Sequence, residues 1–113
     1  MSHKLSLKDV RLSHASVIRA ARFLGLSYKE HDTVQFYDQA VVTGLSVQLP
    51  GWRFPVVIAD RDQTVSYDNY RGNWGDSKEV SRLTGLALLD MQGENLSSVI
   101  VTEKAGELIF ETS

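Results

Sequence analysis

Apolar residues recur along this chain with two spacings, one typical of strands and the other of helices. Near the N-terminus, Leu5 and Leu7 alternate with polar residues over 4–8, which predicts a short, half-buried strand. Ser13 is a candidate N-cap for a helix that follows. The positions that define this helix and its end are Val17, Ile18, Ala20, Ala21, Leu24 and Gly25. We therefore expect an amphipathic helix over 13–24 that lies on a sheet.

The middle of the chain is rich in strand patterns. Alternation over 33–38 and again over 40–49 predicts two strands. A nearly continuous apolar run at 54–59 is typical of a central strand that is buried on both faces. The polar residues 60–63 predict a turn, so 54–67 should form a hairpin.

A second helix should begin at Asp76, where Glu79 completes a capping-box pattern, and should end before Gly93. Helical spacing places five apolar residues on its inward face: Val80, Leu83, Ala87, Leu88 and Met91. Leu86 and Leu89 fall elsewhere, so this helix is apolar around much of its circumference. It either lies deep in the core or presents its outer face to a partner.

The final strand patterns, 97–103 and 108–111, flank a short loop with glycine and predict another hairpin. Residues 13–38 and 76–111 thus share the order helix, strand, strand, which suggests an αββ pseudo-repeat around one sheet. The fold class that these elements predict is α+β. We expect a single domain over 1–113, with two helices packed on one face of a curved, mainly antiparallel sheet.

Composition limits the class of protein. At 113 residues, with 42% apolar and 23% charged residues, the chain resembles one globular domain. Cysteine is absent, which excludes disulfides, thiolate metal ligands and a cysteine nucleophile. No apolar run approaches the roughly 18 residues that span a bilayer, and the N-terminal stretch lacks the apolar run of a signal peptide. We expect a soluble, unsecreted protein without a membrane partner.

Basic charge is concentrated near the N-terminus. Residues 1–31 carry six Lys or Arg against two acids, or +4, whereas 32–113 carry six basic and twelve acidic groups, or −6. Arg19 and Arg22 share the polar face of the first predicted helix and are candidate anion contacts, the alternative being a solvated helix face. A nucleic-acid partner is disfavoured, because the chain lacks a basic excess across the whole domain.

The strongest candidate for a binding site is 67–76, Tyr-Asp-Asn-Tyr-Arg-Gly-Asn-Trp-Gly-Asp, which joins a predicted strand to the second helix. It combines turn formers and glycines with aromatic rings that carry polar tips, a composition favoured in binding surfaces. The residues expected to contact a ligand or partner are Tyr67, Asp68, Asn69, Tyr70, Arg71, Trp74 and Asp76. The alternative is an irregular loop in which Trp74 only closes over the core.

Two other functions remain open for the same segment. Because it runs into a helix N-terminus, a nucleotide or phosphate is a candidate ligand, with Arg71 as the counter-charge. Asp68 and Asp76 could instead flank a divalent metal together with Asn69, as in a small metal-dependent enzyme, although their spacing matches no known calcium loop. No motif supports catalysis, so we assign no catalytic residue, no metal and no cofactor.

The remaining candidate groups are interpreted as surface residues. Asp60 and Asp62 belong to a predicted solvated turn. The three histidines have neither the i, i+4 spacing nor the cysteine neighbours of a zinc motif. They are His3, His14 and His31.

Three stretches resemble the domain-of-unknown-function family 1257, small proteins of cyanobacteria, plastids, other bacteria and some of their viruses. They are the opening Met1-Ser2-His3, the helix end at Leu24-Gly25, and the block from Tyr67-Asp68-Asn69 through Gly72 to Trp74-Gly75-Asp76. The resemblance covers nearly the whole chain. It implies a compact accessory protein of the cytoplasm, of a plastid or, for a virus, of the host cytoplasm, with 68–76 as the shared surface.

Taken with the residues, this resemblance leads us to expect a non-catalytic binding module. It would contact a protein partner or a small-molecule ligand through 67–76. The second helix and an edge strand are also candidate surfaces for self-association.

Overall fold

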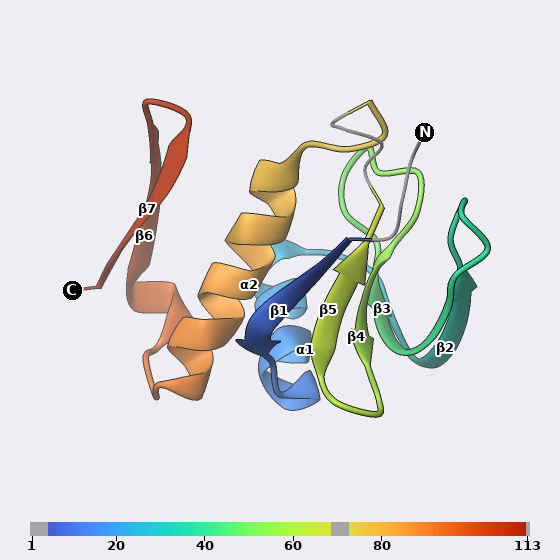
Figure 1. The fold of residues 1–113 in the computed structure, drawn as a ribbon. Coiled ribbons are helices and arrows are strands. Elements are labelled where there is room, and N and C mark those ends of the chain that lie inside the picture. Colours follow the sequence, from blue (N-terminus) through green and yellow to red (C-terminus); the bar gives the residue numbers. More distant parts are fainter. Residues whose placement is uncertain (1–4, 69–72, 113) are drawn as a thin grey trace.

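The computed structural model describes residues 5–68 and 73–112, which form an α+β fold of three layers (Figure 1). A five-stranded sheet is covered on one face by two helices, and a two-stranded hairpin lies on the far side of the helices. The elements are β1 (Leu5–Arg11), α1 (His14–Leu24), β2 (Tyr28–Gln35), β3 (Val41–Val47), β4 (Val56–Ala59), β5 (Thr64–Tyr67), α2 (Ser77–Met91), the 3-10 turn η2 (Leu96–Ser98), β6 (Val99–Lys104) and β7 (Glu107–Thr112).

The five-stranded sheet has the order β1-β5-β4-β3-β2, and every neighbouring pair is antiparallel. Its middle strand, β4, is buried along its whole length, which confirms the predicted central strand. Alternation along β4 turns Val56 and Ile58 toward the core beneath the helices and Val57 toward a smaller cluster on the opposite face. Both faces of the sheet therefore carry a packed apolar layer.

The two helices begin and end close to where the sequence predicts. Gly25 terminates α1 with a left-handed backbone, at φ 73°, a conformation that glycine adopts without steric cost. Asp76 caps α2 by accepting a hydrogen bond from the Lys78 backbone N–H at 3.0 Å. The apolar faces of α1 and α2 meet the same side of the sheet, as expected for this fold class. None of the helices in the described ranges is long and apolar enough to span a membrane.

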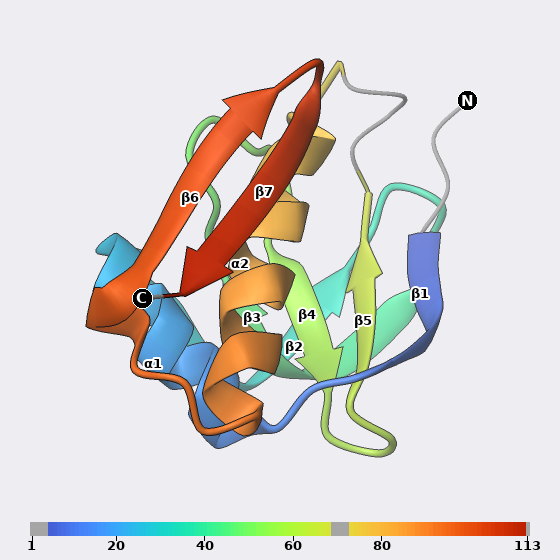
Figure 2. The same cartoon turned by 90° about the vertical axis from the view of Figure 1, so that its left-hand side faces the viewer.

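The burial of α2 differs from the predicted helical face. Leu88 and Met91, expected inside, are 37% and 46% exposed, whereas Leu86, expected elsewhere, is fully buried. A third layer, the hairpin β6–β7, lies in front of α2 in Figure 2 and gives the helix a second buried side at Gly85. The helix is buried between the sheet and this hairpin, so the alternative of deep burial is the one realised.

The hairpin β6–β7 packs against α2 through a close contact at Gly85. A Cβ atom at Gly85 would come within 2.4 Å of Cζ of Phe110, so glycine lets the β7 ring reach the helix backbone. The described residues of β6 and β7 pair only with each other. The order helix, strand, strand occurs twice, but the expectation of one shared sheet is wrong, because the second hairpin forms a separate layer.

The β2–β3 hairpin bends back across the sheet face that points away from the helices (Figure 1). A bulge interrupts its register between Lys29 and Asp32, and His31 within it has a positive φ of 54°. Opposite, Gly44 lies so close to β4 that a Cβ atom would stand 2.0 Å from the Ile58 carbonyl oxygen. The bend returns Phe36, just beyond β2, to the ring of Phe54, with 6.0 Å between centroids.

Candidate functional site

Three aromatic rings meet on the sheet face that the helices leave uncovered. The Trp74 ring lies 5.3 Å from that of Tyr37 and 5.9 Å from that of Phe54, in edge-to-face arrangements. Tyr37 follows β2, Phe54 precedes β4 and Trp74 precedes α2, so three distant segments contribute. We call Tyr37, Arg53, Phe54 and Trp74 the aromatic patch.

Arg53 completes the patch and fixes its geometry. The guanidinium carbon lies 4.4 Å from the Trp74 centroid and 5.6 Å from the Phe54 centroid, within range for cation–π attraction. The Arg53 backbone N–H also donates to the Trp74 carbonyl oxygen at 3.0 Å, which ties the two segments together. Arg53 is exposed, and no acidic side chain of 10–68 or 73–112 forms an ion pair with it.

The patch is neither enclosed nor fully open. Trp74 is half-buried by its own chain, whereas the Tyr37 side chain is 53% exposed. The described cavities lie elsewhere: one of about 360 Å³ between α2 and β7, and one of about 190 Å³ beside β2. Neither cavity is lined by a residue of the patch. The patch therefore presents a partly exposed surface.

The other predicted residues of 67–76 do not all join Trp74. Tyr67 packs on the helix side of the sheet, edge-on to Trp52 at 5.9 Å, and burial raises the pKa of its hydroxyl. Asp68 is fully buried, and Asp76 is the cap of α2. Asn69, Tyr70 and Arg71 lie outside the described residues.

Arg19 and Arg22, the candidate anion contacts, both have partners within the chain. The Arg19 guanidinium donates to Asp90 Oδ2 from Nε at 2.8 Å and lies 2.7 Å from it at Nη2, which ties α1 to α2. This hydrogen bond lowers the pKa of Asp90 below its ordinary value. Arg22 donates to the Tyr28 hydroxyl at 3.0 Å. Both side chains therefore serve internal contacts between elements.

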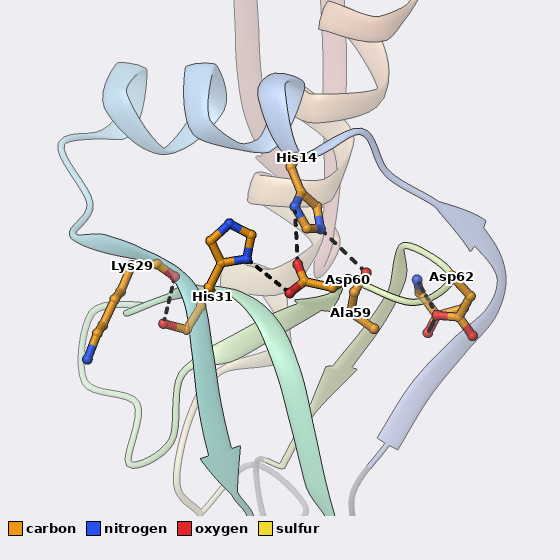
Figure 3. A network of polar contacts seen from close by, with 8 residues as sticks. His14, Lys29, His31, Ala59, Asp60 and Asp62 are labelled. Carbon is orange, nitrogen blue, oxygen red and sulfur yellow. Dashed lines mark hydrogen bonds and ion pairs between the residues drawn. The ribbon is translucent and has the colours of Figure 1, made fainter.

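A polar network that the sequence did not reveal lies at the bend of β2–β3 (Figure 3). The Asp60 carboxylate stands between two imidazoles, with Oδ1 3.6 Å from His14 Nδ1 and Oδ2 3.2 Å from His31 Nδ1. His14 Nε2 is 3.4 Å from the Ala59 carbonyl oxygen. The network joins the start of α1, the end of β4 and the bulge of β2, so it holds the hairpin that carries Tyr37.

Metal binding finds no geometric support in the described ranges. No group of three or more His, Asp or Glu side chains within them has an arrangement that could hold a metal ion. The two carboxylates predicted to flank a metal have different surroundings, since Asp68 is buried and Asp76 accepts the capping hydrogen bond.

The sequence placed Trp74 in the candidate site but missed Tyr37, Arg53 and Phe54. Aromatic residues next to predicted strand ends were the available signal. The bend that unites them depends on a bulge and on one close glycine contact, neither of which has a periodic signature.

Comparison with known proteins gives no indication of what the site binds. No family model matches the chain, and no curated protein or solved structure does so either. The resemblance to the domain-of-unknown-function family 1257 thus stays a prediction that depends on the quoted residues alone.

Proposed function

We propose that this protein is a non-catalytic binding module whose aromatic patch contacts a protein partner. The observation that carries this proposal is the convergence of Tyr, Trp and Arg side chains from three separate segments on one partly exposed surface. These residue types are enriched at protein interfaces and dominate the binding energy there.

The contacts within the patch support the same function. Edge-to-face packing and the stacked guanidinium hold the rings in one arrangement before any partner arrives. A pre-organised surface loses little side-chain entropy on binding, so more of the contact energy is available for affinity.

A nucleotide is the alternative, and Arg53 is the observation that favours it. Aromatic rings stack on bases, and an exposed guanidinium can bind a phosphate. Thermal stabilisation across a panel of nucleoside mono-, di- and triphosphates would support this alternative, since a ligand that binds only the folded state raises its stability. Stabilisation that persists in Arg53→Gln would assign the nucleotide to another surface.

The test uses the whole chain as bait. Partners cross-linked from an extract of the source cells are identified, purified and titrated against wild type, Tyr37→Ala and Trp74→Ala. We expect the dissociation constant to rise at least ~10-fold for both variants, the size of a hot-spot contact. Phe23→Ala is the matched control, because Phe23 is 48% exposed on α1 and outside the patch.

A partner that binds both patch variants as tightly as wild type contradicts the proposal. Near-ultraviolet circular dichroism and the melting temperature of each variant separate lost contacts from lost folding. Tyr37→Ala is the milder change, because its ring is the more exposed of the two.

A further inference from the structure

We propose that the partner segment presents a single carboxylate side chain beside an apolar side chain, so that the patch recognises an acidic–apolar peptide motif. This inference rests on the binding function proposed above and names the chemistry of the partner. The group that selects the carboxylate is Arg53, and the surface that takes the apolar neighbour is formed by Tyr37 and Trp74.

Arg53 lies against an aromatic ring and is exposed to a partner. Its guanidinium lies over the Trp74 ring, so one face of the cation is shielded from water by an aromatic surface. The Arg53 side chain is also exposed, so a partner can reach the guanidinium. A guanidinium can bind a carboxylate through two parallel hydrogen bonds. A neutral amide or an ammonium group in place of the guanidinium cannot reproduce this contact.

The charge of Arg53 lacks a counter-charge within the described ranges. Four described Lys or Arg side chains form ion pairs with carboxylates: Arg19, Lys29, Lys78 and Arg82. Arg53 is exposed and lies over the Trp74 ring, and it forms no such pair with an acid of the described ranges. A partner carboxylate would supply the missing charge next to a surface that already excludes water on one side.

The surroundings favour one carboxylate over a phosphate chain. Asp38 follows Tyr37 directly, and Asp76 is two residues beyond Trp74. Residues 32–113 carry a net charge of −6, from six basic and twelve acidic groups. Acidic residues that are neighbours of the patch in sequence oppose polyanions, whereas a single carboxylate in a bidentate contact meets less repulsion.

The aromatic surfaces beside Arg53 explain the apolar half of the motif. The Tyr37 side chain is 53% exposed and meets Trp74 edge-on, so part of the Tyr37 side chain can be covered by a partner. An aliphatic or aromatic side chain next to the carboxylate would cover these rings and exclude water from the ion pair. Shielded charge pairs contribute more than exposed ones.

The experiment is a selection of random heptapeptides displayed with a blocked C-terminus on immobilised full-length protein. We expect the selected peptides to carry Asp or Glu next to Leu, Ile, Phe or Trp. A synthetic peptide of the selected sequence should bind Arg53→Gln at least ~10-fold more weakly than wild type. Arg53→Lys should weaken binding as well, because an ammonium group retains the charge but loses the fork. Arg61→Gln, an exposed arginine of the β4–β5 turn, is the matched control and should bind like wild type.

The outcomes separate this inference from the function on which it rests. Selected peptides without acidic residues, or peptides whose affinity survives Arg53→Gln but falls in Trp74→Ala, overturn the acidic motif and leave the binding module standing. Failure to select any peptide overturns the peptide motif alone, whereas a selected peptide that binds Trp74→Ala as tightly as wild type contradicts both. If uridine monophosphate binds through Arg53 and no acidic peptide does so, the patch is a nucleotide-binding site. That result would also overturn the inference.

Discussion

A single missing side chain allows the sheet to bend. Gly44 in β3 faces the Ile58 carbonyl oxygen at a distance where a Cβ atom would stand only 2.0 Å away. The obstacle is backbone in the buried central strand, so it cannot rotate aside as a flexible side chain would. The bend brings Tyr37 to Trp74, and the aromatic patch therefore depends on a glycine that is not part of it.

We predict that Gly44→Ala destabilises the fold by about 3 kcal/mol, the upper range for overpacking a well-packed site. Urea denaturation followed by circular dichroism measures the change in the free energy of unfolding. Gly51→Ala is the control, because a Cβ there meets open space and only the positive φ of 75° opposes it, at a cost of about 1 kcal/mol. Equal losses in the two variants would show that close approach at Gly44 does not matter.

Asp60 offers a second prediction for a single residue. Asp60→Asn weakens the contacts to His14 and His31 that hold the bend. We expect a loss of only about 0.5–1 kcal/mol, since these groups are partly or largely exposed. Amide hydrogen exchange should nevertheless speed up locally over 33–43. Asp62→Asn is the matched control: its carboxylate accepts hydrogen bonds from Thr64 within the same turn and does not contact β2. Faster exchange in that control and not in Asp60→Asn would contradict the role of the network.

At the scale of elements, the hairpin β6–β7 depends on the helix beneath it. Two strands alone are marginally stable in water, so this layer needs its contacts with α2. They include the Phe110 ring on Gly85 and an ion pair between Lys78 and Glu103. Val99, Val101 and Phe110 of the hairpin in turn pack against the core cluster that includes Leu86.

We predict that Phe110→Ala releases the hairpin while the five-stranded sheet stays folded. The expected cost is about 2 kcal/mol, below that of a fully buried phenylalanine because this ring is only half-buried. Hydrogen exchange should lose protection over 99–112 and keep it in β3, β4 and β5. Ile109→Ala serves as the control, since strand alternation turns Ile109 to the outer face, where it is 38% exposed. A loss of protection spread evenly over the whole chain would show that the hairpin is not a separate unit.

The elements that the sequence predicted well are those with a regular period. Helix α1 and strand β4 follow spacings that depend only on local geometry. Strand β2 was predicted to begin at 33 but begins at Tyr28, because the bulge and the charged run Lys29-Glu30-His31-Asp32 disrupt alternation. The inward face of α2 was partly wrong because the helix packs on two sides, against the core of the sheet and, at Gly85, against the hairpin β6–β7. The aromatic patch depends both on the bulge in β2 and on packing between separate segments, so the sequence predicted only its Trp74.

At the scale of the whole molecule, the two helices are coupled by the contact between Arg19 and Asp90. The two residues are 71 positions apart in sequence, so their hydrogen bond joins two helices that are distant along the chain. The pKa of Asp90 is lowered, mainly by the hydrogen bond from Arg19 and in addition by Ser16 and by the positive charge itself. Folding thus favours the ionised carboxylate, and the stability of the fold depends on pH through this group.

The direction of that dependence follows from the lowered pKa. A carboxyl whose pKa is lower in the folded state contributes its full stabilisation above the pKa of the unfolded chain, about 3.9, and loses it as the pH falls through the folded value. We predict that Asp90→Asn is less stable than wild type at pH 7 and that the difference shrinks as the pH is lowered from 5 to 2. Urea midpoints measured across this range provide the test. Asp62 also has a lowered pKa, through its hydrogen bonds from Thr64, and remains in both proteins, so its contribution cancels in the comparison. Arg19→Gln should show the same convergence, because it removes the donor that lowers the pKa of Asp90. A stability difference that stays constant from pH 7 to pH 2 would mean that the contact acts through packing alone and that the ionised carboxylate does not couple the helices.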